Sequence, residues 1–257
     1  MVPAQVEVLS KADGECVAVE RPNGTSPLLV ICEHASRRLP ERFGTLGLSE
    51  EALRSHIAWD PGALAVARGI SEALDATLAY QRFSRLVYDC NRPPESPGAM
   101  PEKSEVYDIP GNARLSDEER HARTKALYIP FHDAIRALIR DRKARGQETV
   151  IATVHSFTPI YHGKTRAVEI GILHDEDSRL ADGMLEAAEA GPHRYKIERN
   201  EPYGPADGVT HTLILHGVSN GFRNVMIEVR NDLISDETGQ GVMAGYLTGL
   251  LQQSLDA

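Results

Sequence analysis

Short apolar runs alternate along the chain with longer stretches in which apolar and polar residues mix at helical spacing. The run Leu28–Cys32 is apolar at every position, which is typical of a strand buried on both faces of a sheet. Runs of this kind predict further strands at 6–9, 77–81, 86–90, 149–154, 168–173, 195–197 and 225–229. Helices are predicted from Ser49 onward and at 62–74, 116–145, 178–190, 209–216 and 242–255.

Because strands and helices follow one another along the whole chain, the pattern predicts a single α/β domain over residues 1–257. The expected architecture is a three-layer α/β/α arrangement around a mixed, largely parallel sheet. Residues 91–115 contain five prolines and predict a long loop that could cover a binding site. Pro130 predicts a kink or a break within the helix at 116–145.

The composition describes an ordinary folded protein with an acidic surface. Of the 257 residues, 41% are hydrophobic and 25% are charged, which excludes a disordered chain. A net charge of -9 argues against nucleic acid as a partner. No apolar run approaches the ~18 residues of a membrane span, and no signal-peptide pattern is visible. Three cysteines without a CxxC pair suit a reducing compartment. We therefore expect a cytoplasmic protein that acts on a small molecule, does not bind membranes and could form a homo-oligomer.

Polar side chains follow several of the predicted strands directly. In an α/β sheet, ligands bind beyond the carboxyl ends of the strands. His34 follows the strand at 28–32, and His155 follows the strand at 149–154. Either histidine alone could be a hydrogen-bonded structural residue, but two of them near carboxylates favour a metal site. A catalytic zinc commonly takes two histidines and a carboxylate, and Asp60 is a candidate third ligand, although an Asp before Pro-Gly is also a common turn residue.

Charged residues also lie within or after two other predicted strands. Glu228 and Arg230 are two positions apart, so on a strand they point to the same face. They could form a structural ion pair, or a general base beside an arginine that binds anions. Arg85 and Arg92 flank the strand at 86–90 and could bind substrate carboxylates or pair with surface acids.

Two common kinds of catalytic site are excluded by the sequence. Ser156 neighbours His155, so on a strand the two side chains point to opposite faces, and no G-x-S-x-G motif is present. A serine hydrolase is therefore not expected. Glycine-rich phosphate-binding loops are also absent from the sequence.

Five short blocks of sequence together resemble the N-formylglutamate amidohydrolase family. They are Cys32-Glu-His-Ala-Ser, Trp59-Asp-Pro-Gly-Ala, Ser84-Arg-Leu-Val-Tyr-Asp-Cys-Asn-Arg-Pro-Pro, His155-Ser-Phe and Ile227-Glu-Val-Arg-Asn-Asp-Leu. The resemblance runs in order from about residue 28 to the C-terminus. A more distant resemblance is to the zinc carboxypeptidase and aspartoacylase superfamily, which implies a phosphorylase/hydrolase-like (zinc exopeptidase-like) fold.

The resemblance implies a metal-dependent amidohydrolase, with zinc as the expected ion, that cleaves the amide of a small N-acyl acidic amino acid such as N-formylglutamate. It implies His34 and His155 as metal ligands and Glu228 as the general base, with Arg230 beside it. Asp89, Asn91, Arg92 and Arg85 are the residues expected to bind the substrate. The alternatives are a hydrolase of another N-acyl amino acid or a peptide, and a non-catalytic protein that binds an acidic metabolite.

The third metal ligand is where the chain departs from its distant relatives. Those proteins place a glutamate ligand three residues after the first histidine, where this chain has Arg37. Asp60 is the expected replacement, and Glu33 and Asp89 are the alternatives.

Overall fold

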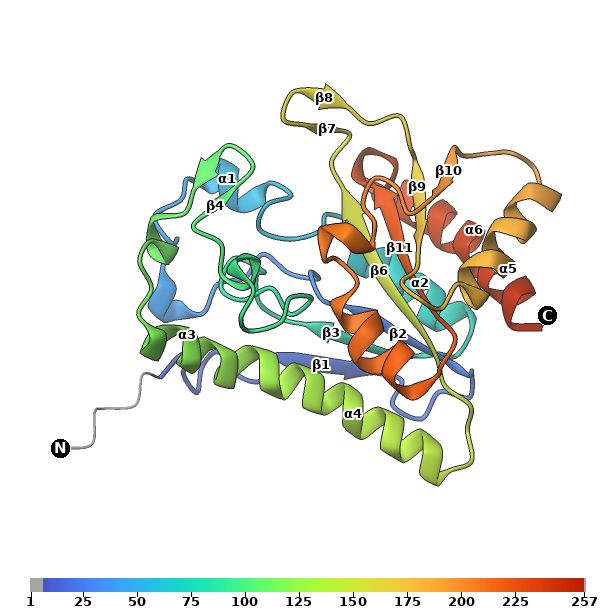
Figure 1. Ribbon diagram of the computed structural model, residues 1–257, viewed down its shortest axis with the longest axis horizontal. Helices are drawn as coiled ribbons and strands as arrows, with labels where there is room; N and C mark the ends of the chain where they lie inside the picture. The colour runs from blue at the N-terminus through green and yellow to red at the C-terminus, as the bar shows by residue number, and fades with distance from the viewer. Residues whose placement is uncertain (1–6, 257) are drawn as a thin grey trace.

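A seven-stranded sheet forms the centre of the protein, and helices pack on both of its faces (Figure 1). The computed structural model describes residues 7–256. The sheet has the order β1-β3-β2-β6-β11-β9-β10, with β1 at Val17–Glu20, β2 at Leu28–Cys32, β3 at Thr77–Gln81, β6 at Val150–Phe157, β9 at Ile170–Leu173, β10 at Ile197–Arg199 and β11 at Asn224–Arg230. Two small hairpins stand apart from it: β4 Lys103–Ser104 with β5 Tyr107–Asp108, and β7 Ile160–Tyr161 with β8 Lys164–Thr165. The helices are α1 Glu50–Arg54, α2 Ala63–Ala73, α3 Asp117–Arg123, α4 Ile129–Ala144, α5 Arg179–Ala190 and α6 Glu237–Asp256.

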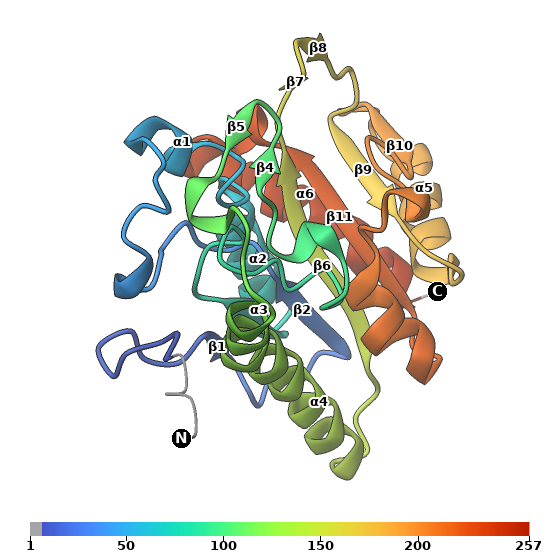
Figure 2. The ribbon, with the colours of Figure 1, turned by 60° about the vertical axis from the view of Figure 1, so that its left-hand side comes forward.

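The central sheet is mixed and largely parallel, as predicted. Strand β2 runs parallel to β3 and β6, and β6 runs parallel to β11, whereas β1 and β9 are antiparallel to their neighbours β3 and β11. The carboxyl ends of β2, β6 and β11 therefore meet at one edge of the sheet, where ligands bind in α/β proteins (Figure 2).

Side chains of β2 show how the two faces of the sheet are buried. Successive side chains of a strand point to opposite faces. Leu28 and Val30 belong to the core shared with α2, α5 and α6, and Leu29 and Ile31 belong to the core shared with α4 and the long loops. All of these side chains are fully buried, which explains why the run is apolar throughout. The predicted three-layer architecture is confirmed.

Two glycines position helix α2 and the loop that precedes it. Gly62 has a φ of 80° at the helix N-cap, and a Cβ there would lie 2.4 Å from the Ile234 carbonyl oxygen. A left-handed residue without a side chain is therefore required at this point. Within the helix, Gly69 lets Ala244 of α6 approach, because a Cβ would lie 2.6 Å from the Ala244 Cβ.

The long helix predicted at 116–145 runs without a break, and it widens into a π-helical turn just before Pro130. Ser116 and Glu119 form the capping box that starts α3. A π-helical segment, Thr124–Tyr128, separates α3 from α4, and Pro130 lies in the first turn of α4. Pro130 has no N–H to donate to the preceding turn, and the helix accommodates it in the turn that follows the π-helical segment.

Two strand predictions are wrong. Residues 86–90 form a turn and irregular backbone whose apolar side chains are nevertheless buried. Side chains replace the strand partner: Asn112 Nδ2 donates to the Leu86 carbonyl at 2.8 Å, and Arg123 Nη1 donates to the Val87 carbonyl at 3.3 Å. For the strand predicted at 6–9, Val6 lies outside the described residues and residues 7–9 are not in a strand; the first strand is β1.

Other predicted boundaries move by a few residues. Strand β6 continues to Phe157, so His155 lies inside the strand rather than after it. The segment 91–115 is not structureless, because it contains the β4–β5 hairpin and short 3-10 turns. The helix predicted at 209–216 is reduced mainly to a π-helical turn, Leu213–Gly217. None of the helices within residues 7–256 combines the length and apolar character that crossing a bilayer would require.

Candidate metal and substrate site

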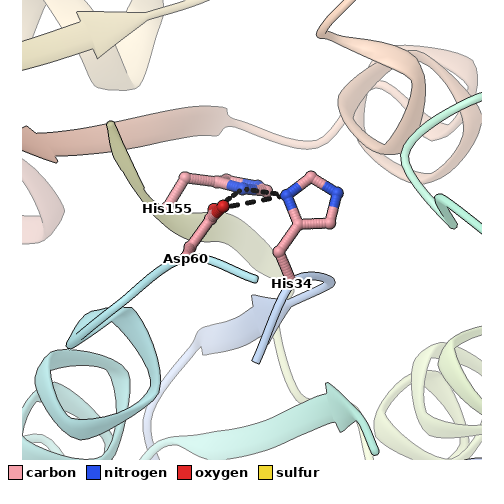
Figure 3. Close-up of side chains that lie close together, drawn as sticks. All are labelled: His34, Asp60 and His155. Carbon is pink, nitrogen blue, oxygen red and sulfur yellow. Dashed lines mark hydrogen bonds and ion pairs between the residues drawn. The ribbon is translucent and has the colours of Figure 1, made fainter. Parts of the chain in front are cut away.

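Three side chains from separate segments converge at the carboxyl edge of the sheet (Figure 3). Asp60 Oδ2 lies 3.2 Å from His34 Nδ1 and 2.9 Å from His155 Nδ1, and the two Nδ1 atoms are 3.2 Å apart. Each of the three residues is nine-tenths buried or more. The structure thus brings together the three residues named as metal ligands.

The fold positions each member of this group. His34 follows β2 after one residue, and the Asp60 backbone N–H donates to the His34 carbonyl at 2.9 Å, which ties the loop before α2 to the end of β2. His155 lies in β6, the next strand of the sheet. Glu228 of β11 is the direct register partner of His155, so the two side chains lie next to each other across parallel strands.

A carboxylate lies next to Nε2 of each histidine ring, on the side of the ring that faces away from Asp60. His34 Nε2 is hydrogen-bonded to Asp89 Oδ1 at 2.7 Å, whereas His155 Nε2 lies 3.1 Å from Glu33 Oε2 as an ion pair without hydrogen-bond geometry. Metal-binding histidines usually donate their second ring N–H to a carboxylate, which fixes the tautomer and leaves the other nitrogen free to bind. Glu33 and Asp89, the alternative third ligands, therefore lie on the far side of the histidine rings from Asp60.

The donor set fits a divalent metal ion. At ligand distances of about 2.0–2.2 Å, neighbouring donors around a tetrahedral zinc are separated by about 3.3–3.5 Å. The observed separations of 2.9–3.2 Å need to widen by only a few tenths of an ångström. Glu228 Oε2 is buried next to this group and has no hydrogen-bond partner among residues 7–256. An unpartnered buried oxygen of this kind is suited to a ligand of the site rather than to the protein core.

The pKa shifts in the site indicate a negative electrostatic potential, which would stabilise a bound cation. Burial disfavours the charged form of His155, yet Glu33 and Asp60 hold its pKa well above the usual value. Burial also opposes ionisation of Asp89, but Arg85 and His34 hold its pKa well below the usual value. A cluster of ionised carboxylates around two histidines would stabilise a metal cation as well as a proton.

Glu228 has the opposite environment. Burial raises the pKa of its carboxyl group to about 7, and the negative charge of Asp60 adds to this effect against the positive charges nearby. A carboxyl group with a pKa near neutrality can accept a proton and release it again at physiological pH.

A cavity of about 330 Å³ opens onto these residues. It is lined by His34, His56, Ile57, Asp60, Arg85, Asp89, Asn91, Arg92, Ser104, His155, Ser156, Phe157, Tyr161, Tyr203, Asp207, Val209 and Glu228. The volume suits a small molecule such as a substituted amino acid.

The predicted substrate-binding residues reach this cavity with different partners. Arg85 is paired with Asp89 at 2.6 Å and lies 3.5 Å from Asp60. The Asn91 side-chain amide accepts from the Thr212 backbone N–H at 2.9 Å and donates to the Val209 carbonyl. Arg92 Nη1 donates to the Asp207 carbonyl at 2.7 Å and to the Gly208 carbonyl. Asn91 and Arg92 therefore hold the 207–212 segment against the cavity.

Arg230 is placed elsewhere. Its guanidinium pairs with Asp232 at 2.8 Å and with Glu169 at 3.4 Å, and it is not among the residues that line the cavity. Sequence reasoning missed Tyr203 and Tyr161, which do line it. Neither tyrosine stands in a recognisable motif or directly after a predicted strand, so no signal in the sequence identifies them.

A buried group of two histidines and one carboxylate with a neighbouring glutamate, at the carboxyl ends of the strands of an α/β sheet, is typical of hydrolytic enzymes. The chain belongs to the N-formylglutamate amidohydrolase family, whose model matches residues 26–235. It is therefore a hydrolase of the amidohydrolase type, acting on carbon–nitrogen bonds.

Solved structures are similar to this chain to different degrees. The gene product Atu2144 of Agrobacterium tumefaciens is 58% identical, covers 97% of this chain and 98% of its own, and superposes with a TM-score of 0.95. An N-formylglutamate amidohydrolase from Ralstonia eutropha is 19% identical, covers 94% of this chain and 97% of its own, and has a TM-score of 0.63, so it supports the fold. An aspartoacylase family protein from Mesorhizobium loti is 14% identical over 90% of this chain and 68% of its own, with a TM-score of only 0.34. No curated protein matches the sequence significantly.

Proposed function

We propose that the protein is a metal-dependent amidohydrolase that removes a formyl or other short acyl group from the nitrogen of an acidic amino acid. N-formylglutamate is the expected substrate, in keeping with the family. The observation that carries the proposal is the convergence of His34, Asp60 and His155 on one point beside Glu228.

His34, Asp60 and His155 would hold the metal ion. Two histidines and a carboxylate, with a fourth position open to water, are the usual ligands of a catalytic zinc. A bound zinc lowers the pKa of water to about 7 and withdraws electrons from the carbonyl group of the substrate. Asp89 and Glu33 would keep the two histidine rings oriented rather than contact the substrate.

Glu228 would move the proton. As a carboxylate it accepts a proton from the attacking water, whose oxygen forms the new bond to the acyl carbon. As a carboxylic acid it returns that proton to the amine nitrogen when the carbon–nitrogen bond breaks, so the products are a short acid and a free amino acid. A pKa of about 7 lets the same group perform both transfers.

Arg92 and Asn91 would bind one carboxylate of the substrate at the wall formed with the 207–212 segment. Arg85 would instead hold Asp89 and Asp60 in place, because both carboxylates already face its guanidinium.

The experiment is an assay of formate or acid release with N-formyl-L-glutamate, N-formyl-L-glutamine, N-acetyl-L-glutamate and a γ-glutamyl dipeptide. The highest kcat/KM is expected for N-formyl-L-glutamate. Faster hydrolysis of another amide would show that N-formyl-L-glutamate is not the preferred substrate and would leave the proposed reaction unchanged. Saturable binding without hydrolysis of any of the four would replace the enzyme by a binding protein.

A further inference from the structure

The arginines predicted to bind the substrate leave one carboxylate without a receptor. Arg85 is paired with Asp89 and Asp60, and Arg230 is paired with Asp232 and Glu169 away from the cavity. Within residues 7–256, only Arg92 among these arginines faces the cavity without a carboxylate partner. An N-acyl acidic amino acid carries two carboxylates, so a second cation is needed.

Arg166 follows the β7–β8 hairpin, which projects beyond the carboxyl end of β6 (Figure 1). Its guanidinium carbon lies 4.4 Å from the ring centroid of Tyr161, 4.7 Å from that of Tyr203 and 5.6 Å from that of Phe157. All three aromatic residues line the cavity. The rings thus hold the guanidinium next to the cavity by cation–π contacts, although Arg166 itself is not among the residues that line it.

The charge of Arg166 is not neutralised by the protein. No carboxylate of the described chain lies within ion-pair distance of its guanidinium. Within the described residues, the Arg166 side chain makes one hydrogen bond, in which Nη1 donates to the Tyr203 hydroxyl at 2.8 Å. A guanidinium has five N–H donors, so most of its donors stay available to a ligand. Arg166 is also partly exposed, so a ligand can reach it.

The charge of Arg166 contributes to the pKa shifts of two residues that line the cavity. Burial is the main cause that raises the pKa of Tyr203 to about 12; Glu228 raises it further, and Arg166 acts against both. Burial lowers the pKa of His56, and Arg166 is one of the positive charges that add to this lowering. Tyr203 therefore lies within reach of both the proposed base and the Arg166 guanidinium.

We propose that Arg166 binds the side-chain carboxylate of the substrate and sets the preference for acidic over neutral N-acyl amino acids. The inference rests on the proposed function and deepens it. A guanidinium held against aromatic rings presents its fork of N–H donors to a carboxylate, and a neutral amide of the same shape lacks the charge to pair with it. Arg92 is then left to bind the α-carboxylate.

The test compares N-formyl-L-glutamate with N-formyl-L-glutamine, which has almost the same shape and lacks the side-chain charge. Arg166→Met should raise KM for the glutamate substrate by roughly tenfold or more, the loss of a charge-assisted hydrogen bond, and change KM for the glutamine substrate much less. Arg166→Lys should restore part of the preference, because it keeps the charge without the fork. Lys164→Met removes a charge from an exposed residue of the same hairpin and should change neither KM. Equal effects of Arg166→Met on both substrates, or no effect, would overturn the inference.

A binding measurement separates this inference from the proposed function. If the wild-type protein hydrolyses neither compound, the reaction is wrong, and calorimetry with L-glutamate and L-glutamine still tests Arg166. Tighter binding of L-glutamate that is lost in Arg166→Met and partly kept in Arg166→Lys supports the inference. Equal binding of the two amino acids by the wild type contradicts it. Should Arg166→Met fail to fold, Arg166→Lys decides, since full retention of the preference for L-glutamate would show that the fork is not needed.

Discussion

The carboxylate of Asp89 lies 2.7 Å from Nε2 of His34, while Nδ1 of the same ring faces Asp60. Asp89 is itself held by Arg85 at 2.6 Å. In the proposed metal site, this chain of contacts would orient the ring and favour the tautomer whose Nδ1 lone pair faces Asp60. Asp89 would then act through His34, whereas the sequence suggested that it binds substrate.

We expect Asp89→Asn to weaken metal binding by roughly 10- to 100-fold, because an amide cannot stabilise the ring as a carboxylate does. The measurement is metal affinity by competition with a coloured chelator. Asp177→Asn is the matched control, since Asp177 pairs with Arg179 on the surface and should leave the affinity unchanged. An Asp89→Asn protein with wild-type metal affinity would show that Asp89 has no such role.

Glu228→Gln tests the proposed proton transfer. We expect kcat to fall by roughly 10²–10⁴-fold while substrate binding and metal content stay near wild type, because glutamine has the same shape and cannot accept a proton. The pH profile adds a second measurement. Since the carboxylate form is needed, kcat/KM of the wild type should rise with pH and level off near or below pH 7, as the positive charge of a bound metal lowers the pKa further. Unchanged turnover in Glu228→Gln would remove Glu228 as the base.

The residues predicted best from sequence are those on buried strands. Every position of Leu28–Cys32 is apolar, so the strand and the place of His34 after it could be read directly, and His155 and Glu228 follow from similar runs. The run at 86–90 looked the same but is buried as a loop, because Asn112 and Arg123 satisfy its backbone carbonyls from more than twenty residues away in the chain. Local pattern carries no information about such distant partners.

Arg230 shows a second limit. Strand alternation places it on the same face as Glu228, but β11 ends at this residue and its guanidinium pairs with Asp232 just beyond the strand. Alternation predicts the direction in which a side chain leaves a strand, and the position of a long charged tip depends on which partners it meets. The contacts of Arg166 with three aromatic rings also depend on residues that are distant in the sequence, and no sequence motif predicts them.

The positions of the two arginines predict different kinetics. We expect Arg92→Ala to raise KM for N-formyl-L-glutamate by roughly tenfold or more, because it removes a cation from the cavity wall and two hydrogen bonds to the 207–208 carbonyls. Arg230→Ala should change KM little, because its partners Glu169 and Asp232 lie outside the cavity. Steady-state kinetics of the two variants make the comparison. A larger KM effect for Arg230→Ala than for Arg92→Ala would contradict this placement.

A buried pair of histidines makes the fold sensitive to acid. His132 Nδ1 lies 2.9 Å from His216 Nε2, and burial lowers the pKa of His132 to about 3 and that of His216 to about 4. Below pH ~6.5 the unfolded chain binds protons at these residues and the folded protein does not, so the free energy of unfolding falls by about 1.4 kcal/mol per pH unit for each histidine.

Urea unfolding between pH 7.5 and pH 5 measures this effect. As the pH falls through this range, the stability of His216→Gln should rise relative to that of the wild type, because one of the two groups that protonate only in the unfolded chain is gone. The difference between the two proteins isolates the pair from the other titrating residues. Parallel pH dependences for wild type and variant would show that the pair is not responsible.

Metal content measured together with activity tests the proposed centre most directly. The purified wild-type protein should contain about one divalent ion per chain, lose activity on treatment with a chelator and regain it when zinc is restored, and His155→Ala should retain neither ion nor activity. A protein that hydrolyses N-formyl-L-glutamate at full rate with no metal bound would contradict the proposed mechanism.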